Sequence, residues 1–291
     1  MAFLTVFTPL YNRVYSLPRT YESMCKQKCK DFIWMIIDDG STDNAHSLIE
    51  EWMKKENGFK IEYIYKKNGG MHTAHNEAYR HITTELNVCI DSDDALADDA
   101  VQKIYDKWQS IKDKNYAGII ALDADFHGKI IGKGFPEGLK STTVMEYYNN
   151  GGYGDKKLVY RTDVINSYPE YPVFDNEKYV SLAYKYRLID QEYEMAVLDD
   201  VLCNVEYQED GSTNNMLRQY RNNPQGFAFW RKIRMIYPDS KKRMVVDCIH
   251  YVSSSLLAKN NKFIKESPKK FLTVLSLPAG FMLMQYIKHK T

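Results

Sequence analysis

Four short runs typical of β-strands, each followed by a polar turn, constrain the fold of this chain more than any other feature. The runs are Leu4 to Phe7, Phe32 to Ile37, Ile61 to Tyr65 and Asn87 to Ile90. The first two are apolar, and apolar stretches of this length are typical of strands buried on both faces of a sheet. The segments between them predict helices over residues 17–26, from a cap at residues 41–43 to residue 52, and over residues 73–81. Strands alternating with helices predict a Rossmann-like α/β fold, with a mostly parallel central sheet flanked by helices.

Three loops rich in polar side chains follow these runs, and the predicted topology brings them together. They are Thr8–Arg13, Asp38–Asp43 and Asp91–Asp94. In an open parallel sheet, ligands bind beyond the carboxyl ends of the strands. We therefore expect all three loops to contribute to one binding site.

The aspartates of Asp91-Ser92-Asp93-Asp94 predict a cation site. Carboxylates at this spacing repel one another, and burial adds to the cost of that repulsion. Mn²⁺ or Mg²⁺ would remove the cost, because both ions take oxygen ligands. Such a cation would also bind the oxygens of a diphosphate. The alternative is a solvated turn or the start of a helix, where acidic residues are favoured in any case.

Two more segments follow strands at the same predicted edge. Asp38-Asp39-Gly40-Ser41 offers carboxylates that could accept a hydrogen bond from a nucleobase N–H or a ribose hydroxyl. It suits a capping turn for the next helix equally well. Lys66-Lys67-Asn68-Gly69-Gly70-Met71-His72 offers positive charge and glycines that let the backbone approach a phosphate.

Charge is divided unequally along the chain. From Leu217 to the C-terminus there are 15 Lys/Arg and 3 Asp/Glu, a net of +12. The rest of the chain has 24 of the 39 basic and 35 of the 38 acidic residues, a net of −11. A basic tail of this kind indicates a negatively charged partner, either nucleic acid or an anionic membrane surface.

The apolar stretch Phe271 to Ile287 favours the membrane surface. It carries no charge and is flanked by Lys269-Lys270 and Lys288. It is shorter than the roughly twenty residues that span a bilayer, and Pro278 divides it. We therefore expect an interfacial anchor on the inner leaflet; a helical cap packed on the catalytic domain is the alternative. Nucleic acid is disfavoured because the tail ends in apolar sequence.

The cysteines and the N-terminus indicate the compartment. The five cysteines are scattered and include no Cys-x-x-Cys pair, which is typical of packing roles in a reducing compartment. Residues 1–10 are too short for a signal peptide, and Pro9 interrupts them. We expect a cytoplasmic protein that associates peripherally with the cytoplasmic membrane.

The order of four motifs resembles family-2 glycosyltransferases. The motifs are Thr8-Pro9-Leu10-Tyr11-Asn12, Asp38-Asp39-Gly40-Ser41-Thr42-Asp43, Asn68-Gly69-Gly70 with Ala74-His75-Asn76, and Asp91-Ser92-Asp93-Asp94. The resemblance is strong over residues 1–100 and looser to about residue 215. It implies a GT-A fold, a nucleotide-sugar donor and inversion of the anomeric centre.

The resemblance also implies roles for single residues. Thr8 and Tyr11 would line the base pocket, and Asp39 would contact the uracil. Asp91 would contact the ribose, and Asp93 would bind the metal. The full set of expected nucleotide-sugar contacts is Thr8, Pro9, Tyr11, Asn12, Asp38, Asp39, Asn68, Gly70, His72, Asn76, Asp91 and Ser92. One departure is His75, where the family more often has arginine.

An inverting transfer needs a general base near the acceptor hydroxyl. The resemblance implies that residues 174–179 hold an acidic pair that supplies this base, although Lys178 stands where the family commonly has aspartate. Glu177 is the first candidate and Asp175 the second; the alternative is a surface acid paired with Lys178. Residues 154–156 and 208–212 are expected to frame the acceptor side.

Together these features predict an inverting, metal-dependent glycosyltransferase of the hexosyltransferase type. It would move a sugar from a UDP-sugar to a lipid-linked glycan acceptor in surface polysaccharide synthesis. Residues 1–215 would form the catalytic domain, with the donor side in 1–100 and the acceptor side in 101–215; residues 216–291 would form a basic helical extension. The alternatives are a nucleotidyltransferase, for which Thr8–Arg13 lacks a glycine-rich basic loop, and a non-catalytic sugar-nucleotide or membrane-binding module.

Overall fold

A computed structural model describes residues 2–206 and 215–291. These residues group into two compact units. The first unit comprises residues 2–68, 74–170 and 188–206; the second comprises residues 69–73, 171–187 and 215–291. The division after residue 215 remains a prediction for the functional domains. By packing, however, residues 171–187 belong with the C-terminal helices.

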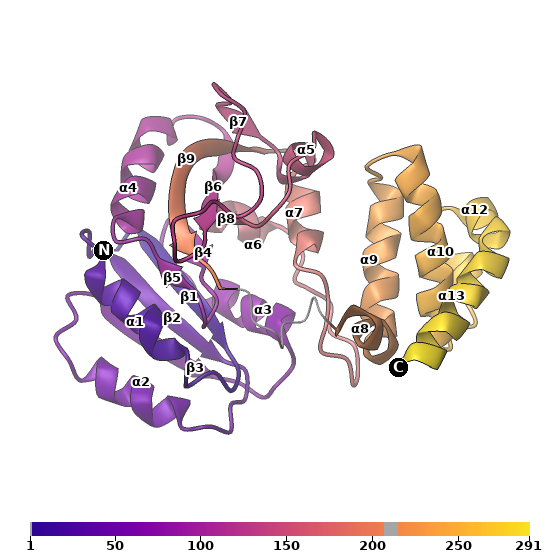
Figure 1. The fold of residues 1–291 in the computed structure, drawn as a ribbon, viewed down its shortest axis with the longest axis horizontal. Coiled ribbons are helices and arrows are strands. Elements are labelled where there is room, and N and C mark those ends of the chain that lie inside the picture. The colour runs from indigo at the N-terminus through magenta and orange to yellow at the C-terminus, as the bar shows by residue number, and fades with distance from the viewer. Residues whose placement is uncertain (1, 207–214) are drawn as a thin grey trace. The chain divides into compact units, whose positions relative to one another are not determined.

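A nine-stranded mixed sheet forms the centre of the first unit (Figure 1). Its strands are β1 Leu4–Leu10, β2 Phe32–Asp38, β3 Lys60–Tyr65, β4 Leu86–Cys89, β5 Ala95–Leu96, β6 Tyr116–Ala124, β7 Ser141–Thr142, β8 Lys156–Arg161 and β9 Glu194–Asn204. The spatial order is β3-β2-β1-β4-β8-β6-β9-β5, with β7 also paired to β9. Strands β3, β2, β1 and β4 are parallel, whereas β8 runs antiparallel to β4 and β6. The predicted mostly parallel sheet is confirmed.

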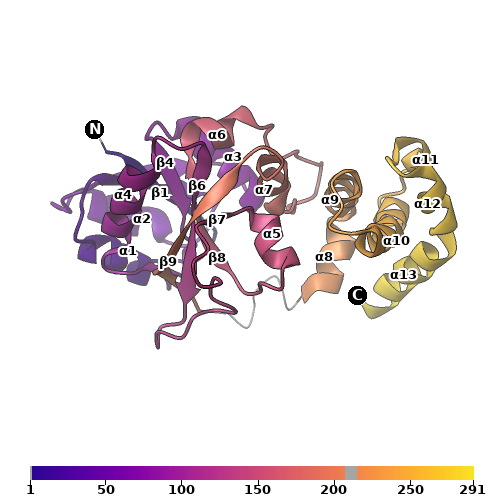
Figure 2. The ribbon, with the colours of Figure 1, turned by 90° about the horizontal axis from the view of Figure 1, so that it is seen from above.

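Thirteen helices are present among the described residues. They are α1 Leu17–Lys26, α2 Ala45–Met53, α3 Met71–His81, α4 Ala100–Ile111, α5 Val144–Asn149, α6 Thr162–Ser167, α7 Ala183–Ile189, α8 Met216–Asn222, α9 Pro224–Ile236, α10 Lys241–Leu257, α11 Phe263–Glu266, α12 Lys270–Leu275 and α13 Leu277–Lys290. Helices α1, α2 and α4 cover one face of the sheet, and α3 and α6 lie on the other (Figures 1 and 2). The helices and strands predicted up to residue 90 are confirmed within a few residues.

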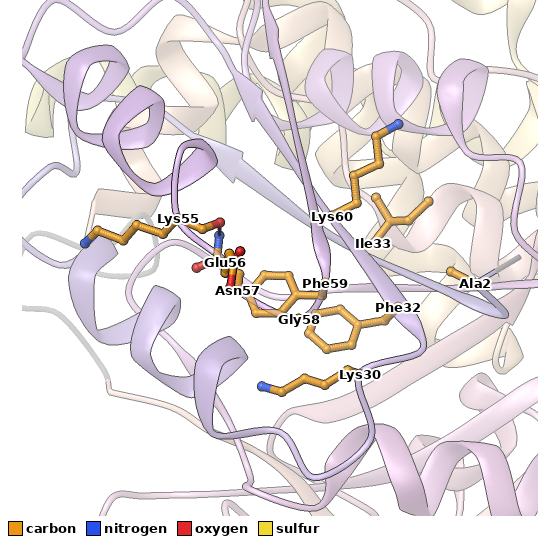
Figure 3. A pocket seen from close by; sticks show the side chains of 10 residues that line it. All are labelled: Ala2, Lys30, Phe32, Ile33, Lys55, Glu56, Asn57, Gly58, Phe59 and Lys60. Atoms are coloured by element: carbon orange, nitrogen blue, oxygen red, sulfur yellow. Dashed lines mark hydrogen bonds between the residues drawn. The ribbon is translucent and has the colours of Figure 1, made fainter.

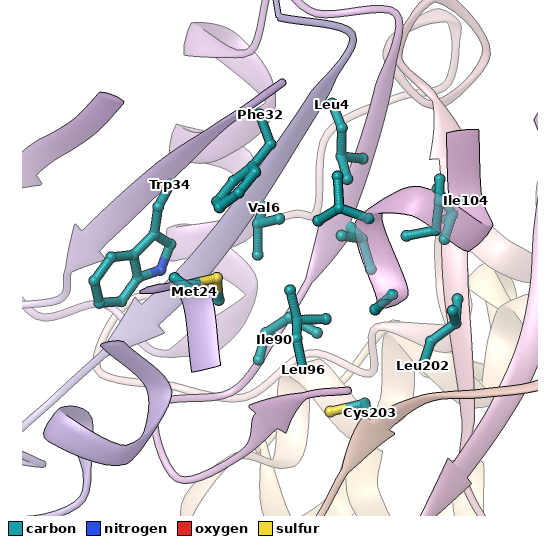
Figure 4. Packing of buried hydrophobic residues seen from close by; sticks show 14 of the residues in the cluster. Leu4, Val6, Met24, Phe32, Trp34, Ile90, Leu96, Ile104, Leu202 and Cys203 are labelled. Carbon is teal, nitrogen blue, oxygen red and sulfur yellow. The ribbon is translucent and has the colours of Figure 1, made fainter. Parts of the chain in front are cut away.

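The core of the first unit is built from alternate residues of the central strands. Leu4 and Val6 of β1 and Trp34 of β2 point toward α1, where Met24 packs against them (Figure 4). Trp34 is fully buried, and its indole N–H donates to Thr8 Oγ1 at 3.0 Å. The bond satisfies a polar group that would otherwise destabilise the core.

Strand β1 extends further than the sequence predicted. The expected strand ended at Phe7, before Thr8-Pro9, but β1 continues to Leu10. Proline lacks an N–H and is rare inside a central strand. Phe7 accepts its hydrogen bond from Ile90 on the β4 side, so Pro9 also faces that side, beyond the end of β4. No ladder bond is lost there, and the strand continues along β2.

The second unit holds a bundle of C-terminal helices. Helix α10 lies between α9 and the α12–α13 pair (Figure 1). A cluster of Met235, Cys248, Tyr251, Val252 and Phe263 forms its apolar core. No helix among residues 2–206 and 215–291 is long and apolar enough to cross a membrane.

Candidate active site

The register of the central strands brings the predicted loops to one edge of the sheet. Leu10 at the end of β1 pairs with Asp38 at the end of β2, and Asp38 pairs with Tyr65 at the end of β3. On the other side, Phe7 of β1 pairs with Cys89, the last residue of β4. The loops after β1, β2 and β4 therefore start from neighbouring strand ends, as expected. We call this the strand-end edge.

Hydrogen bonds join the loop after β1 to the loop after β2. The backbone N–H of Asn12 donates to Ser41 Oγ at 3.0 Å, and the N–H of Thr42 donates to Asn12 Oδ1 at 2.7 Å. The N–H of Val14 donates to Asp43 Oδ2 at 2.9 Å. These bonds occupy Ser41 Oγ and Asp43 Oδ2, but Asp43 Oδ1 still accepts from the N–H of Ala45 at 3.3 Å. Asp43 therefore contacts the start of α2, which begins after Asn44, and the side chain of Asn44 makes no capping bond.

The two aspartates after β2 have different surroundings. Asp38 is buried; it accepts from the N–H of Ser41 at 2.7 Å and from the hydroxyl of Tyr63 at 2.6 Å. Burial, and then the bond to Asp38, raises the pKa of the Tyr63 hydroxyl. Asp39 accepts instead from Lys66 Nζ at 2.5 Å. Asp38 thus holds the loop together, whereas Asp39 joins it to the chain after β3.

Asn68 packs against the loop after β2 at the strand-end edge. Its side-chain amide donates to the backbone oxygen of Asp39 at 2.7 Å. Gly40 has φ of +81°, and a Cβ there would lie 2.8 Å from the backbone nitrogen of Asn68. The approach therefore requires glycine. The side-chain oxygen of Asn68 is buried and has no hydrogen-bond partner within residues 2–206 and 215–291. A buried acceptor of this kind is available to a ligand N–H or O–H.

The other expected donor contacts differ in accessibility. Tyr11 is 48% exposed, whereas Thr8 is fully buried beneath Trp34. His72 and Asn76 of α3 are also buried. Gly70 has φ of +92°, and a Cβ there would lie 2.0 Å from the backbone oxygen of Lys178. Tyr11 is therefore better placed than Thr8 for a contact through its side chain.

Helix α1 holds the aspartate loop by its backbone. Ser16 Oγ donates to the backbone oxygen of Ser92 at 3.0 Å, and Thr20 Oγ1 donates to that of Asp94 at 2.7 Å. The guanidinium of Arg19 donates to the backbone oxygen of Asp93. We did not predict these positioning residues. Their only sequence signal is the polar series Ser16, Arg19, Thr20 and Ser23 on one side of a helix.

A buried lysine lies among the aspartates. Lys157 of β8 has its Nζ 3.8 Å from Asp123 Oδ1. Burial raises the pKa of Asp94 to about 8, although Lys157 opposes the shift, and burial also raises the pKa of Asp91. Burial disfavours the charge on Lys157, but Asp123, Cys203 and the other acids outweigh it and raise the pKa of Lys157 well above its ordinary value. The sequence did not reveal this cation, because β8 reaches β4 only through the tertiary fold.

The charges at this loop suit a divalent cation held together with a phosphate ligand. Asp91, Asp94 and Asp123 face Lys157, and Lys156 acts on Asp123 as well, yet burial still raises the pKa of all three carboxyl groups. A further positive charge is therefore favoured. Within the described ranges, no three His, Cys, Asp or Glu side chains are grouped to hold a metal unaided. Mg²⁺ commonly takes one or two carboxylates and completes its shell with phosphates and water. Asp93, which is half-buried, fits that pattern.

Glu177 has a role that the sequence did not predict. It is buried, and its two carboxylate oxygens accept from the N–H groups of Gln225 and Gly226, each at 2.8 Å. These groups begin α9, where a carboxylate is stabilised by the helix dipole. Glu177 is therefore not the surface acid paired with Lys178 that was the alternative. Asp175, the second candidate, is exposed.

The structure also places His75 and Lys156. His75 lies inside the fold, with Nδ1 3.2 Å from the Tyr79 hydroxyl and its ring against Phe7. Lys156 Nζ donates to the backbone oxygens of Asp155 and Ile131, at 3.0 and 3.2 Å. The acceptor-side residues 208–212 lie outside the described residues.

A pocket of about 600 Å³ lies elsewhere in the first unit (Figure 3). Phe32 and Lys60, at the amino ends of β2 and β3, contribute to its lining, as do residues 55–59. The rings of Phe32 and Phe59 stack at 4.7 Å. The pocket is at the opposite ends of the strands from the strand-end edge, so it is not the predicted donor site.

Comparison with known proteins agrees with this arrangement. The model of the family described as Glycosyl transferase family 2 matches residues 5–165, a range that includes every loop of the strand-end edge. Among solved structures, S. aureus TarS 1-349 in complex with UDP-GlcNAc is 14% identical, with a TM-score of 0.60, covering 99% of this chain and 91% of that one. The mannosyltransferase PcManGT from Pyrobaculum calidifontis, in complex with GDP-Man and Mn²⁺, is 16% identical, with a TM-score of 0.57, covering 98% and 87%. At these identities the likeness shows the fold, and the expected GT-A architecture is confirmed.

Proposed function

The chain belongs to glycosyl transferase family 2, and from this premise we propose that it transfers the sugar of a UDP-sugar to a glycan acceptor with inversion. Family membership makes it a glycosyltransferase that depends on a nucleotide-sugar donor. The nucleotidyltransferase and the non-catalytic module are set aside on the same ground. Four details belong to the proposal: which nucleotide the donor carries, which metal is bound, which residue is the base and what the acceptor is.

The unpaired oxygen of Asn68 is the observation that carries the assignment of the donor site. It is a buried acceptor on the strand-end edge, next to the Asp39–Lys66 pair. A uracil ring offers one N–H between two carbonyl oxygens, so one acceptor and a nearby cation complement it. Solved structures of TarS contain UDP and UDP-GlcNAc, which supports the choice of uridine here.

We assign the metal to Asp93 together with the donor diphosphate. A divalent cation bound there would supply Lewis-acid stabilisation of the departing diphosphate. Asp91 and Ser92 would contact the ribose, and α1 would hold their loop through Ser16, Arg19 and Thr20. The mannosyltransferase from Pyrobaculum calidifontis contains Mn²⁺, which supports Mn²⁺ as the first ion to test.

We propose Asp175 as the base in preference to Glu177. In an inverting transfer the acceptor hydroxyl oxygen bonds to the anomeric carbon while the bond to the diphosphate oxygen breaks, and the base takes the hydroxyl proton. A base needs an oxygen lone pair that is accessible to the acceptor. Both oxygens of Glu177 already accept from the start of α9, whereas Asp175 is exposed.

We also propose a lipid-linked glycan acceptor, met at the inner leaflet in surface polysaccharide synthesis. The net charge of +12 after residue 216 supports work at an anionic surface. An acceptor held in the same leaflet would be concentrated near the enzyme. Nucleic acid is not part of this proposal.

A donor panel tests the proposed activity. Purified protein with Mn²⁺ is incubated with UDP-sugars and GDP-mannose, and released UDP, GDP and pyrophosphate are measured separately. We expect slow release of UDP from at least one UDP-sugar, and none after chelation of the metal. Release of pyrophosphate, or of GDP alone, would contradict the proposal.

A further inference from the structure

The outer side of the last two helices is covered by large apolar side chains. Six of them are between 45% and 75% exposed: Phe271, Val274, Leu275, Phe281, Met282 and Tyr286. We call this set the outer stripe. Exposed apolar residues are ordinary when scattered, but a contiguous group on a protein surface marks an interaction site.

The six residues share one side because the chain passes from α12 into α13 through a single residue. Ser276, between the two helices, has the right-handed helical conformation, with φ of −83° and ψ of −4°. Along the run 271, 274/275, 278, 281/282, 285/286 and 289, successive exposed positions are three or four residues apart. Such positions lie on the same side of a helix. The stripe therefore extends over both helices.

The opposite side of the same helices is fixed by packing. Thr273, Met284 and Ile287 are buried. A Cβ on Gly280 would lie 2.5 Å from Val252, so α13 lies close against α10 there. Rotating the stripe inward would break this contact. The outward position of the stripe is thus set by the fold of the second unit.

The charges around the stripe select its partner. Between Ser267 and Thr291 there are four lysines and no acidic residue. Lys269 and Lys270 lie at its start, and Lys288 and Lys290 at its end. A second copy of the chain would bring lysines against lysines in either orientation. An anionic lipid surface accepts the apolar side chains between the headgroups and pairs the lysines with phosphates.

We propose that the outer stripe lies in the plane of an acidic membrane, with its apolar side chains inserted at the headgroup level and its lysines on lipid phosphates. The inference deepens the proposed function, on whose inner-leaflet location it rests. It gives the two sides of residues 271–287 different roles, because one side packs on α10 within the second unit while the other side serves as the anchor. With only one side inserted, binding should be reversible.

Sedimentation with vesicles tests the stripe in the full-length protein. Vesicles of phosphatidylcholine alone are compared with vesicles of equal parts phosphatidylcholine and phosphatidylglycerol. The stripe variant is Phe271→Ser with Met282→Ser. The matched control is Val245→Ser with Val246→Ser, which removes two exposed apolar side chains of α10 outside the stripe. We expect the stripe variant to lose about tenfold or more in vesicle affinity, and the control to bind as the wild type does.

Charge is tested separately by replacing Lys269, Lys270 and Lys288 with glutamine. We expect this variant to lose most of the preference for phosphatidylglycerol, and the wild type to lose it in high salt. Circular dichroism and UDP release without vesicles should remain unchanged in every variant.

Equal vesicle binding by the wild type and the stripe variant would overturn the proposal, and so would a wild type that does not bind vesicles. A wild-type dimer that the stripe variant makes monomeric would show that a second copy covers the stripe instead. If stripe-dependent binding holds but no UDP is released, the proposed function fails and the membrane surface stands.

Discussion

The strand-end edge and the C-terminal helices distribute polar and apolar groups in opposite ways. At the edge, polar side chains gather at the surface end of an apolar core, and hydrogen bonds to backbone groups hold them. In the helices, Asp247 is buried between Arg231 and Arg234, at 2.7 and 2.9 Å. The apolar side chains of Phe271 and Met282, by contrast, are exposed to solvent. The first pattern suits a polar ligand that is bound in a defined position, and the second suits an apolar surface met from outside.

This comparison predicts that single polar substitutions affect catalysis at the edge and stability in the helices. The largest effect should follow Asp93→Ala. We expect kcat for sugar transfer to fall by about a thousandfold, because the metal site loses its protein ligand. Thermal unfolding in the absence of donor should change little. Metal-dependent turnover equal to that of the wild type would remove Asp93 from the site.

Asp175 and Glu177 offer a sharper division within three residues. We expect Asp175→Asn to lower kcat by about a hundredfold, as for loss of a general base. Glu177→Gln should instead lower the free energy of unfolding by about 1–2 kcal/mol, because it weakens the cap of α9. Initial rates and urea unfolding of both variants distinguish these outcomes. A reversed result would restore Glu177 as the base.

A substitution in helix α1 should have a smaller effect on catalysis. Thr20→Val removes the hydroxyl that donates to the backbone oxygen of Asp94 and keeps the side-chain volume. We expect about a tenfold loss in kcat/KM with a native fold, because small displacements of a site reduce catalysis. Lys107→Ala on α4, outside the edge, is the matched control. Full activity of Thr20→Val would show that the aspartate loop keeps its position without α1.

The smallest expected effect is on how the stability of the protein depends on pH, through His250 in the second unit. Burial, together with Arg231, lowers the pKa of His250 to about 4. Between about pH 6.5 and 4 the unfolded chain binds the proton more readily, so stability is present above that range and lost as pH falls through it. We expect the free energy of unfolding of His250→Gln to fall by about 1–2 kcal/mol less than that of the wild type over this pH range. Urea unfolding at several pH values would measure it, and parallel pH curves for the two proteins would refute it.

Local sequence patterns predicted the first half of the fold well. Strands β1 to β4 and their loops are encoded in short apolar runs and polar turns, and parallel pairing then aligns their ends. Lys157 could not be predicted in the same way, because β8 inserts antiparallel between β4 and β6 from far along the chain. The cap formed by Glu177 depends on N–H groups of residues 225 and 226. Such contacts follow from tertiary packing and leave no local pattern.

The central claim, that the nucleotide binds at the strand-end edge, is tested most directly by calorimetric titration with UDP in the presence of Mn²⁺. Asn68→Ala removes the unpaired acceptor at the edge, and Lys60→Ala alters the pocket at the opposite ends of the strands. We predict that Asn68→Ala weakens UDP binding by about tenfold or more, as expected for a lost hydrogen bond to a buried group, while Lys60→Ala binds as the wild type does. Unchanged binding by Asn68→Ala with weakened binding by Lys60→Ala would contradict the account.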